Sequence, residues 1–128
     1  MRCLLDANVF IFLDLDPGRL SAIAQREILN PANELLLSMA SLWEIQLKIA
    51  RGKLTLSRPL IEIVAAQCQV NGLRLFGLAP AHVYRLGTLP FHHHDPFDRI
   101  IIAQALVEGM SIITSDGEFA PYGVALLW

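Results

Sequence analysis

Short apolar runs alternate with segments of helical periodicity along the whole chain, and this alternation limits the possible folds more than any other feature. The runs predicted to be strands cover residues 2–5, 34–38, 73–78, 111–114 and 124–127. Helices are predicted over residues 20–28, from Ser38 or Ser41 to 52, and over 59–71, 80–86 and 96–108. Strands that alternate with helices indicate an α/β fold with a mainly parallel sheet.

The size and composition of the chain favour one globular domain over residues 1–128. Hydrophobic residues make up 54% and charged residues 17%, which excludes a disordered chain. This apolar share suits a sheet buried on both faces, and it also allows an apolar surface for a partner. No apolar run reaches the roughly 18–20 residues of a membrane span. The net charge of −2 gives no support to bulk attraction of nucleic acid.

Two cysteines, Cys3 and Cys68, lack the spacing of metal ligands or of a disulfide framework. We expect reduced, buried thiols in a cytoplasmic protein.

The longest predicted helix begins with an unusually clear signal. Asp95 suits the capping position and Pro96 suits the first helical position, where no N–H is needed. Phe97, Ile100 and Ile101 then recur at helical spacing. Asp98 falls in the first turn, where the helix dipole favours an anion. For Asp95 or Asp98 alone, stabilising the helix start is a sufficient explanation.

Three other acids occupy comparable places. Asp6 follows the first predicted strand, Glu44 lies near the start of the helix after the second, and Asp116 follows the fourth. Strand-to-helix junctions of a parallel sheet share one edge, which is where such folds bind ligands. We therefore expect these three acids at one edge, joined by Asp98 if its helix begins there.

Each acid also has a structural explanation. Ser41 and Glu44 have the spacing of a capping box, and Glu44 can pair with Lys48 one turn later. Asp116 precedes a glycine and suits a turn. Asp6 is the hardest to explain structurally, because its apolar neighbours make an unpartnered carboxylate costly.

Four converging carboxylates would repel one another and raise their pKa values. A divalent cation removes this repulsion, and an oxygen-only ligand set suits Mg²⁺ or Mn²⁺. Such an ion lowers the pKa of bound water and stabilises charge on a phosphodiester. Many α/β proteins carry acids at strand ends, so the spacing alone leaves the chemistry open.

Several motifs in this order resemble the PIN-domain nucleases, in particular the VapC-type toxins of bacterial and archaeal toxin–antitoxin pairs. They are Leu4-Leu5-Asp6-Ala7-Asn8, Ser41-Leu42-Trp43-Glu44-Ile45, Gly52-Lys53-Leu54, Asp95-Pro96-Phe97-Asp98-Arg99 with Ile102-Ala103-Gln104-Ala105, Thr114-Ser115-Asp116 and Tyr122-Gly123-Val124. The resemblance implies a three-layer α/β/α fold around a five-stranded, mainly parallel sheet. Ala7 and Ser115 depart from the family pattern, which usually has a hydroxyl residue and a basic residue there.

The resemblance also implies an activity. Asp6, Glu44, Asp98 and Asp116 would hold Mg²⁺ or Mn²⁺ and a water that cleaves RNA to leave a 5′-phosphate. Asn8 and Thr114 would orient the carboxylates. Such proteins are usually homodimers, and the C-terminal segment of a cognate antitoxin covers their active-site groove.

Some remaining side chains have more than one explanation. Lys48, Arg51, Lys53 and Arg99 form either a phosphate-binding patch or solvated helix ends with an ion pair of Arg99. The three histidines 92–94 lack zinc-ligand partners and are expected in a loop, where His94 has the option of touching substrate. His82 is expected at the surface, and Trp43 and Trp128 in the core or a dimer contact.

Two other functions compete. A phosphoacceptor receiver domain also uses acids at strand ends, but it needs a lysine after a late strand, and Lys48 and Lys53 both belong to the second helix region. An inactive PIN-like module would bind a protein partner through apolar surface, and the complete set of acids argues against it.

Overall fold

The computed structural model describes all 128 residues and contains one five-stranded sheet. The strands are β1 (Arg2–Leu5), β2 (Glu34–Ser38), β3 (Arg74–Phe76), β4 (Ser111–Ile113) and β5 (Leu126–Leu127). Their order is β3-β2-β1-β4-β5, and every neighbouring pair is parallel. The predicted parallel sheet is therefore confirmed, although β3 and β5 are shorter than the apolar runs that predicted them.

The strand order reverses at the middle of the sheet. After β1 the chain builds outward through β2 to β3, and it then returns to place β4 on the other side of β1. Leu5 lies beside Ile113, so the carboxyl ends of β1 and β4 are adjacent. Ligands of open α/β sheets bind at such a reversal, beyond the carboxyl ends of the strands.

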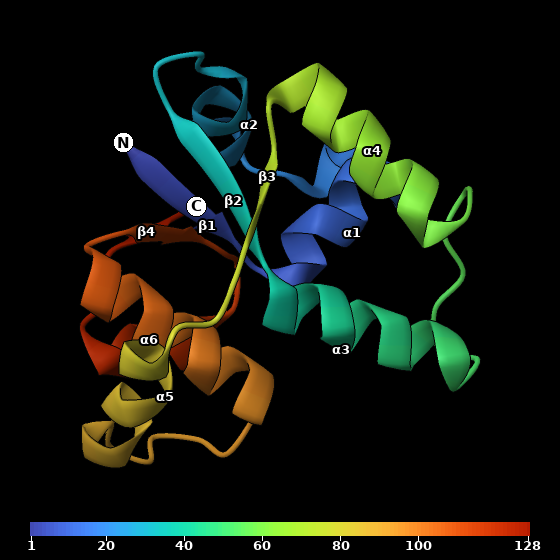
Figure 1. Cartoon of the computed structure of the whole chain (residues 1–128). Helices are drawn as coiled ribbons and strands as arrows, with labels where there is room; N and C mark the ends of the chain where they lie inside the picture. The colour runs from blue at the N-terminus through green and yellow to red at the C-terminus, as the bar shows by residue number, and fades with distance from the viewer.

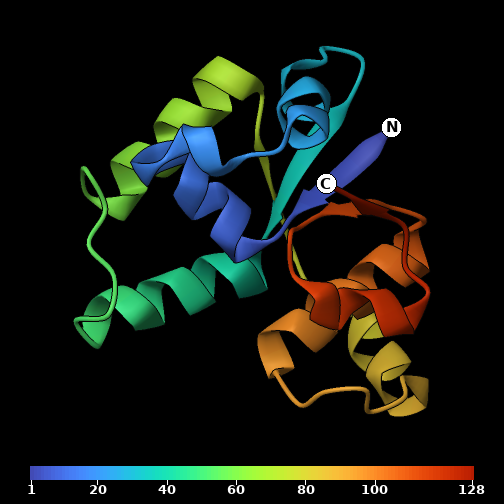
Figure 2. The same ribbon diagram turned by 180° about the vertical axis from the view of Figure 1, so that it is seen from behind.

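Helices cover both faces of the sheet (Figures 1 and 2). They are α1 (Ala7–Leu15), η1 (Pro17–Arg19), α2 (Ala22–Leu29), α3 (Met39–Ala50), α4 (Leu60–Asn71), α5 (Pro80–Arg85), η2 (Leu86–Thr88), α6 (Pro96–Glu108) and η3 (Gly117–Tyr122). Helices α1, α2 and α4 lie on one face, and α5 and α6 on the other. The fold is the predicted three-layer α/β/α sandwich.

The core consists of two apolar clusters that share the sheet. Along β1, Cys3 and Leu5 belong to the cluster under α1, α2 and α4, whereas Leu4 belongs to the cluster under α6. Side chains alternate between the faces of a strand, so a strand covered on both faces must be apolar at every position. This requirement explains the uninterrupted apolar sequence of β1.

Local signals define the ends of α6 as the sequence predicts. The Asp95 side chain accepts hydrogen bonds from the backbone N–H groups of Phe97 and Asp98. Gly109 ends the helix at φ 68°, in the left-handed region that favours glycine.

The start of α3 resolves one prediction and corrects another. Ser38 caps this helix by accepting from the N–H of Ala40, so the earlier of the two predicted starts is right. The capping box of Ser41 and Glu44 is wrong, because both residues lie inside the helix. The ion pair of Glu44 and Lys48 is present at 3.4 Å.

Two buried-versus-exposed predictions are also wrong. His82 is only 1% exposed, because α5 packs against α6. Its Nδ1 accepts from the N–H of Ala79, and its Nε2 lies 2.9 Å from Glu108. Cys68 is exposed, whereas Cys3 is buried and burial raises the pKa of its thiol. No helix in the structure is long and apolar enough to cross a membrane.

Candidate active site

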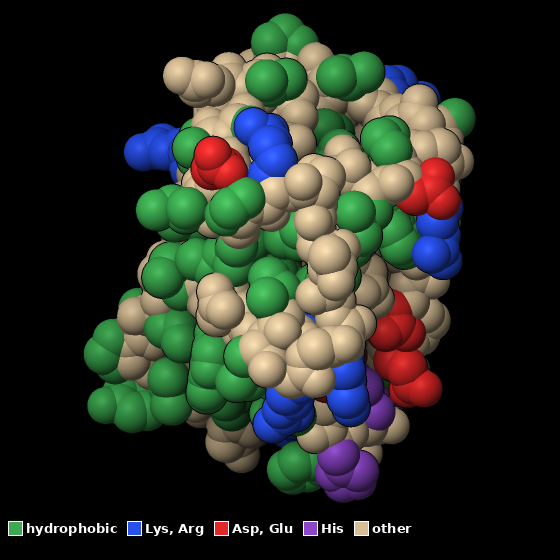
Figure 3. Space-filling view, turned by 90° about the vertical axis from the view of Figure 1, so that its right-hand side faces the viewer, with side chains coloured by type: hydrophobic (Ala, Val, Ile, Leu, Met, Phe, Trp, Pro, Cys, Tyr) green, Lys and Arg blue, Asp and Glu red, His purple; other side chains and the backbone are tan.

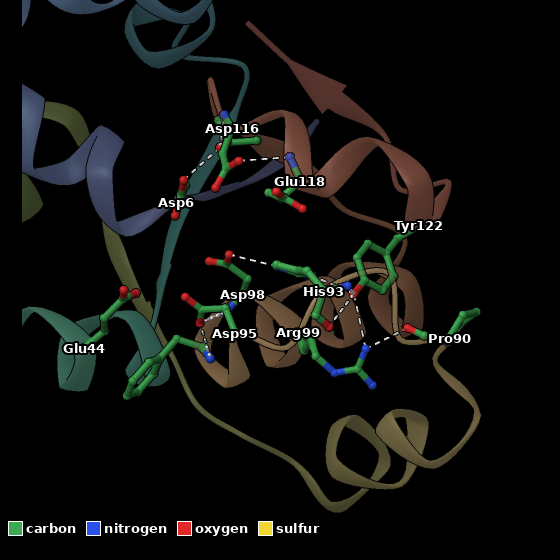
Figure 4. A network of polar contacts seen from close by, with 12 residues as sticks. Asp6, Glu44, Pro90, His93, Asp95, Asp98, Arg99, Asp116, Glu118 and Tyr122 are labelled. Atoms are coloured by element: carbon green, nitrogen blue, oxygen red, sulfur yellow. Dashed lines mark hydrogen bonds and ion pairs between the residues drawn. The ribbon is translucent and has the colours of Figure 1, made fainter.

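Acidic side chains from four separate segments face one space at the carboxyl edge of the sheet (Figure 4). Asp6 directly follows β1, and Asp116 directly precedes η3 after β4. Glu44 lies on α3, the helix that follows β2, and Asp98 lies in the first turn of α6. The N terminus of α6 therefore points to the same edge, which is the condition that the sequence left open for Asp98.

Asp6 is the most deeply buried of these acids, at 4% exposed. Its Oδ2 accepts a hydrogen bond of 2.8 Å from the hydroxyl of Thr114, which follows the neighbouring strand β4. Burial raises the pKa of Asp6 to about 6. The Thr114 hydrogen bond opposes this rise, and the charges of Glu44 and Asp116 add to it.

Asp98 is held from the loop that precedes its helix. Its Oδ2 lies 3.0 Å from Nε2 of His93. Burial raises the pKa of Asp98 to about 7 even though the hydrogen bond with His93 opposes the rise. The charges of Asp95, Asp6 and Glu44 raise it further, which is the repulsion expected of converging carboxylates.

Glu44 and Asp116 complete the group. Burial raises the pKa of Glu44, while the nearby Lys48 ammonium lowers it in part. Asp116 donates its backbone N–H to the Thr114 hydroxyl and caps η3 through the N–H of Glu118. The Thr114 hydroxyl thus joins Asp116 to Asp6, the orienting contact that the resemblance implied.

The donor chemistry of this group fits a hard divalent cation. The facing atoms are carboxylate oxygens, and their repulsion is what such an ion relieves. No three His, Cys, Asp or Glu side chains stand close enough together to hold an ion as they are placed.

Comparison with known proteins identifies the family of this chain. The sequence model of the PIN domain family matches residues 3–124. The chain belongs to the PIN domain family. Among individual proteins, ribonuclease VapC22 of Mycobacterium tuberculosis is 29% identical over 114 residues, which cover 88% of this chain and 85% of VapC22.

Solved structures with the same fold include two toxin–antitoxin complexes. This PIN domain is similar to a chain of DNA-bound VapBC from Salmonella typhimurium, with a TM-score of 0.72, 18% identity and coverage of 98% of this chain and 96% of that one. VapBC2 of Rickettsia felis, bound to a promoter fragment, gives a TM-score of 0.71, 15% identity and coverage of 98% and 97%. At this identity the likeness concerns the fold.

Two of the residues predicted to serve the site make no hydrogen bond to the four acids. Arg99 is 5% exposed and binds the backbone carbonyls of Leu89 and Pro90 at 3.2 and 2.7 Å, so it is neither part of a phosphate patch nor in an ion pair. Asn8 is exposed on the first turn of α1, and no hydrogen bond joins it to the four acids.

The other cations of the predicted patch lie along and beyond α3. Lys48 pairs with Glu44 at the site, whereas Arg51 and Lys53 are exposed at the far end of the helix.

The role of one histidine in the PIN domain site was not predicted from the sequence. His93 was expected only as a loop residue, yet it contacts Asp98 through Nε2 and the hydroxyl of Tyr122 through Nδ1. The spacing of His93 and Asp98 gives a weak signal, but nothing in the pattern indicates Tyr122.

An apolar groove of about 410 Å³ runs between α3 and α4 of the PIN domain. Its hydrophobic lining is Met39, Leu42, Trp43, Leu60, Ile61, Val64 and Leu75. Figure 3 shows hydrophobic side chains gathered over a broad part of this side of the molecule. Trp43 is 61% exposed and meets Phe97 edge to face at 5.2 Å, so it is not a core residue, and its place in a dimer contact stays a prediction. Trp128 is half-buried against the core.

Proposed function

We propose that this PIN domain is a Mg²⁺- or Mn²⁺-dependent endoribonuclease and the toxin of a toxin–antitoxin pair. The observation that carries the proposal is the convergence of Asp6, Glu44, Asp98 and Asp116 on one space, with the pKa values of Asp6 and Asp98 raised to about 6 and about 7. Such a group is costly to assemble unless a cation joins it.

In the proposed site these four acids are the metal ligands. A Mg²⁺ or Mn²⁺ ion held by them would lower the pKa of a bound water and would stabilise charge on the phosphodiester. The Thr114 hydroxyl donates to Oδ2 of Asp6 and would hold this ligand in its orientation. Lys48 holds Glu44, and the cap to Glu118 holds one oxygen of Asp116.

RNA is the proposed substrate, in keeping with the ribonuclease VapC22 among the relatives. Bulk charge does not favour a polyanion, so contacts with phosphate must be local. We assign Lys48 and Arg51 to such contacts. The burial of Arg99 removes it from this role.

We further propose an antitoxin protein and a second copy of the chain as partners. The similar structures include members of VapBC, a family of toxin–antitoxin systems. The groove between α3 and α4 and the exposure of Trp43 and Ile61, at 61% and 79%, support binding of a protein. A catalytically inactive interaction module would share this surface, but it would have no use for four buried or half-buried acids.

The test is cleavage of RNA by the purified protein in Mn²⁺, in Mg²⁺ and in EDTA. We expect cleavage only with the metals, and a loss of about 100-fold or more in Asp6→Asn and in Asp98→Asn, because each removes a ligand worth several kcal/mol in the transition state. Asp16→Asn is the matched control, since Asp16 is an exposed acid in the loop after α1.

Equal cleavage by the wild type and both site variants would refute the assigned site. Growth on induction, with and without the adjacent reading frame, then separates a toxin from an inert binder. Growth that continues normally when the chain is expressed alone would refute the toxin assignment.

A further inference from the structure

The imidazole of His93 bridges Asp98 and Tyr122 (Figure 4). Its Nε2 lies 3.0 Å from Oδ2 of Asp98, and its Nδ1 lies 2.7 Å from the hydroxyl oxygen of Tyr122. The side chains of His93 and Asp98 are each 12% exposed. Water is thus largely excluded from the contact, and the donors and acceptors of the three groups must match.

The hydrogen bonds of Tyr122 decide which ring nitrogen carries the proton. Its hydroxyl oxygen accepts from the backbone N–H of His93 at 3.1 Å and from Nη1 of Arg99 at 3.2 Å. A hydroxyl oxygen accepts at most two hydrogen bonds, so the hydroxyl proton must be donated. Nδ1 of His93, at 2.7 Å, is a nearer acceptor than the backbone carbonyl of His93 at 3.3 Å.

It follows that Nδ1 is an acceptor and that a neutral His93 carries its proton on Nε2. This proton is donated to Oδ2 of Asp98. In the imidazolium form Nε2 carries a proton as well, so the contact with Asp98 has the same direction in either charge state.

Arg99 holds the bridge in place. It binds the carbonyls of Leu89 and Pro90, and its guanidinium lies 3.9 Å from the centre of the Phe91 ring. The loop that carries His93 is thereby tied to α6, the helix that carries Asp98. The loop therefore presents the imidazole in one orientation.

We propose that His93 is a positioning residue for Asp98: by donating to Oδ2 it directs Oδ1 into the space shared with Asp6, and Tyr122 selects the tautomer that makes this possible. The inference deepens the proposed metal site and rests on it. Oδ2 of Asp98 accepts the hydrogen bond from His93, whereas Oδ1 of Asp98 has no hydrogen-bond partner in the protein.

Two near-isosteric substitutions separate positioning of Asp98 from anchoring of the loop. In His93→Gln the amide reaches the place of Nε2 and still donates to Asp98, but the acceptor for Tyr122 is lost. In His93→Asn the shorter amide reaches the place of Nδ1 and still accepts from Tyr122, but the donor to Asp98 is lost. His94→Leu is the matched control, because His94 is an exposed neighbour in the same loop with no hydrogen bond to the acids.

The measurement is Mn²⁺ affinity by calorimetric titration of the intact protein, with thermal unfolding in EDTA as the check of folding. Loss of an outer partner of a metal ligand commonly weakens binding about 10–100-fold, which is the effect expected for His93→Asn. His93→Gln and His94→Leu are expected within about three-fold of the wild type, because both keep a donor on Asp98.

The opposite ranking, with His93→Asn near the wild type and His93→Gln weak, would overturn the inference and leave His93 as a loop anchor. Equal affinity in all variants would also overturn it. A wild type that binds no Mn²⁺ refutes the proposed metal site itself, and the inference with it, so the two failures give different results.

The role of Tyr122 has a readout that needs no metal. Long-range ¹⁵N–¹H NMR of neutral His93 is expected to place the proton on Nε2 in the wild type and to show a mixture of tautomers in Tyr122→Phe. A mixture in the wild type would overturn the assignment of the tautomer. Introduced into the wild type, Tyr122→Phe is also expected to weaken Mn²⁺ binding. Introduced into the His93→Gln variant, it is expected to cause no further loss of affinity. Equal losses of affinity in the two backgrounds would show that Tyr122 acts independently of His93.

Discussion

Asp6 and Asp98 face the same space with comparable burial, but they are held by groups of different structural origin. Thr114, at the end of β4, holds Asp6 from the adjacent strand, so the register of β1 and β4 sets the contact. His93 holds Asp98 from a loop, and that contact depends on Tyr122 and Arg99 as well. The orientation of Asp6 thus depends on one residue of an adjacent strand. The orientation of Asp98 depends on a loop whose own position is set by further contacts.

Ionisation is unfavourable for both Asp6 and Asp98. Burial and mutual repulsion favour the protonated form of each acid, and the hydrogen bonds from Thr114 and His93 offset only part of this effect. The metal-free site therefore opposes folding whenever the acids are ionised.

The largest expected effect is the dependence of stability on pH without metal. The folded-state pKa of Asp6 lies above its ordinary value of 3.8, at about 6, so the folded state binds more protons and stability falls as pH rises through this window. A shift of this size corresponds to about 3 kcal/mol when complete, of which about 2 kcal/mol falls between pH 4 and pH 8. Urea unfolding in EDTA measures it.

Asp6→Asn and Asp98→Asn separate the contributions of the two acids to this pH dependence. Each is expected to flatten the pH profile, Asp6→Asn up to about pH 6 and Asp98→Asn up to about pH 7, following their pKa values. Saturating Mn²⁺ should abolish the fall in the wild type. Profiles of both variants that run parallel to the wild type would show that the acids do not repel one another as the structure indicates.

A smaller effect is expected from Thr114→Val, which keeps the shape of the side chain and removes the hydroxyl. The pKa of Asp6 should rise further, because the Thr114 hydrogen bond lowers it, and stability should fall by about 1–2 kcal/mol. Carboxyl ¹³C titration by NMR measures the shift. Thr114→Ser, which keeps a hydroxyl, is the control. A pKa shift of Asp98 as large as that of Asp6 would show that Thr114 does not act on Asp6 alone.

The smallest effect is expected from Lys48→Met, which removes the cation that pairs with Glu44. Lys48 is 38% exposed, so stability should change by less than about 0.5 kcal/mol. The pKa of Glu44 should still rise, because Lys48 lowers it. Lys53→Met is the control. A decrease of more than about 1 kcal/mol in the free energy of unfolding of Lys48→Met would show that solvent does not screen the ion pair with Glu44.

Local signals predicted a large part of the fold. The start of α6 depends on Asp95 and Pro96 and its end on Gly109, all within one turn of the residues they affect. The same kind of signal failed at α3, where Ser38 and Ser41 are both good caps. Ser38 caps the helix because β2 ends there and holds it in an extended conformation.

The candidate site was predicted in part. The parallel topology brings Asp6, Glu44 and Asp116 to one edge, and the structure adds Asp98. The bridge of His93 was not predictable, because its partner Tyr122 is 29 residues away in sequence. The burial of His82 and Arg99 was missed for the same reason, since their partners belong to other segments.

The succession of strands and helices, and therefore the edge of the sheet at which the acids meet, could be predicted from residue patterns. Hydrophobic periodicity, helix caps and helix-breaking residues act over a few residues, so they can be recognised in the sequence. The group that holds each carboxylate oxygen depends on how distant segments pack together. Thr114 and His93 gain their roles when strand order and loop packing bring distant segments within hydrogen-bonding distance of Asp6 and Asp98.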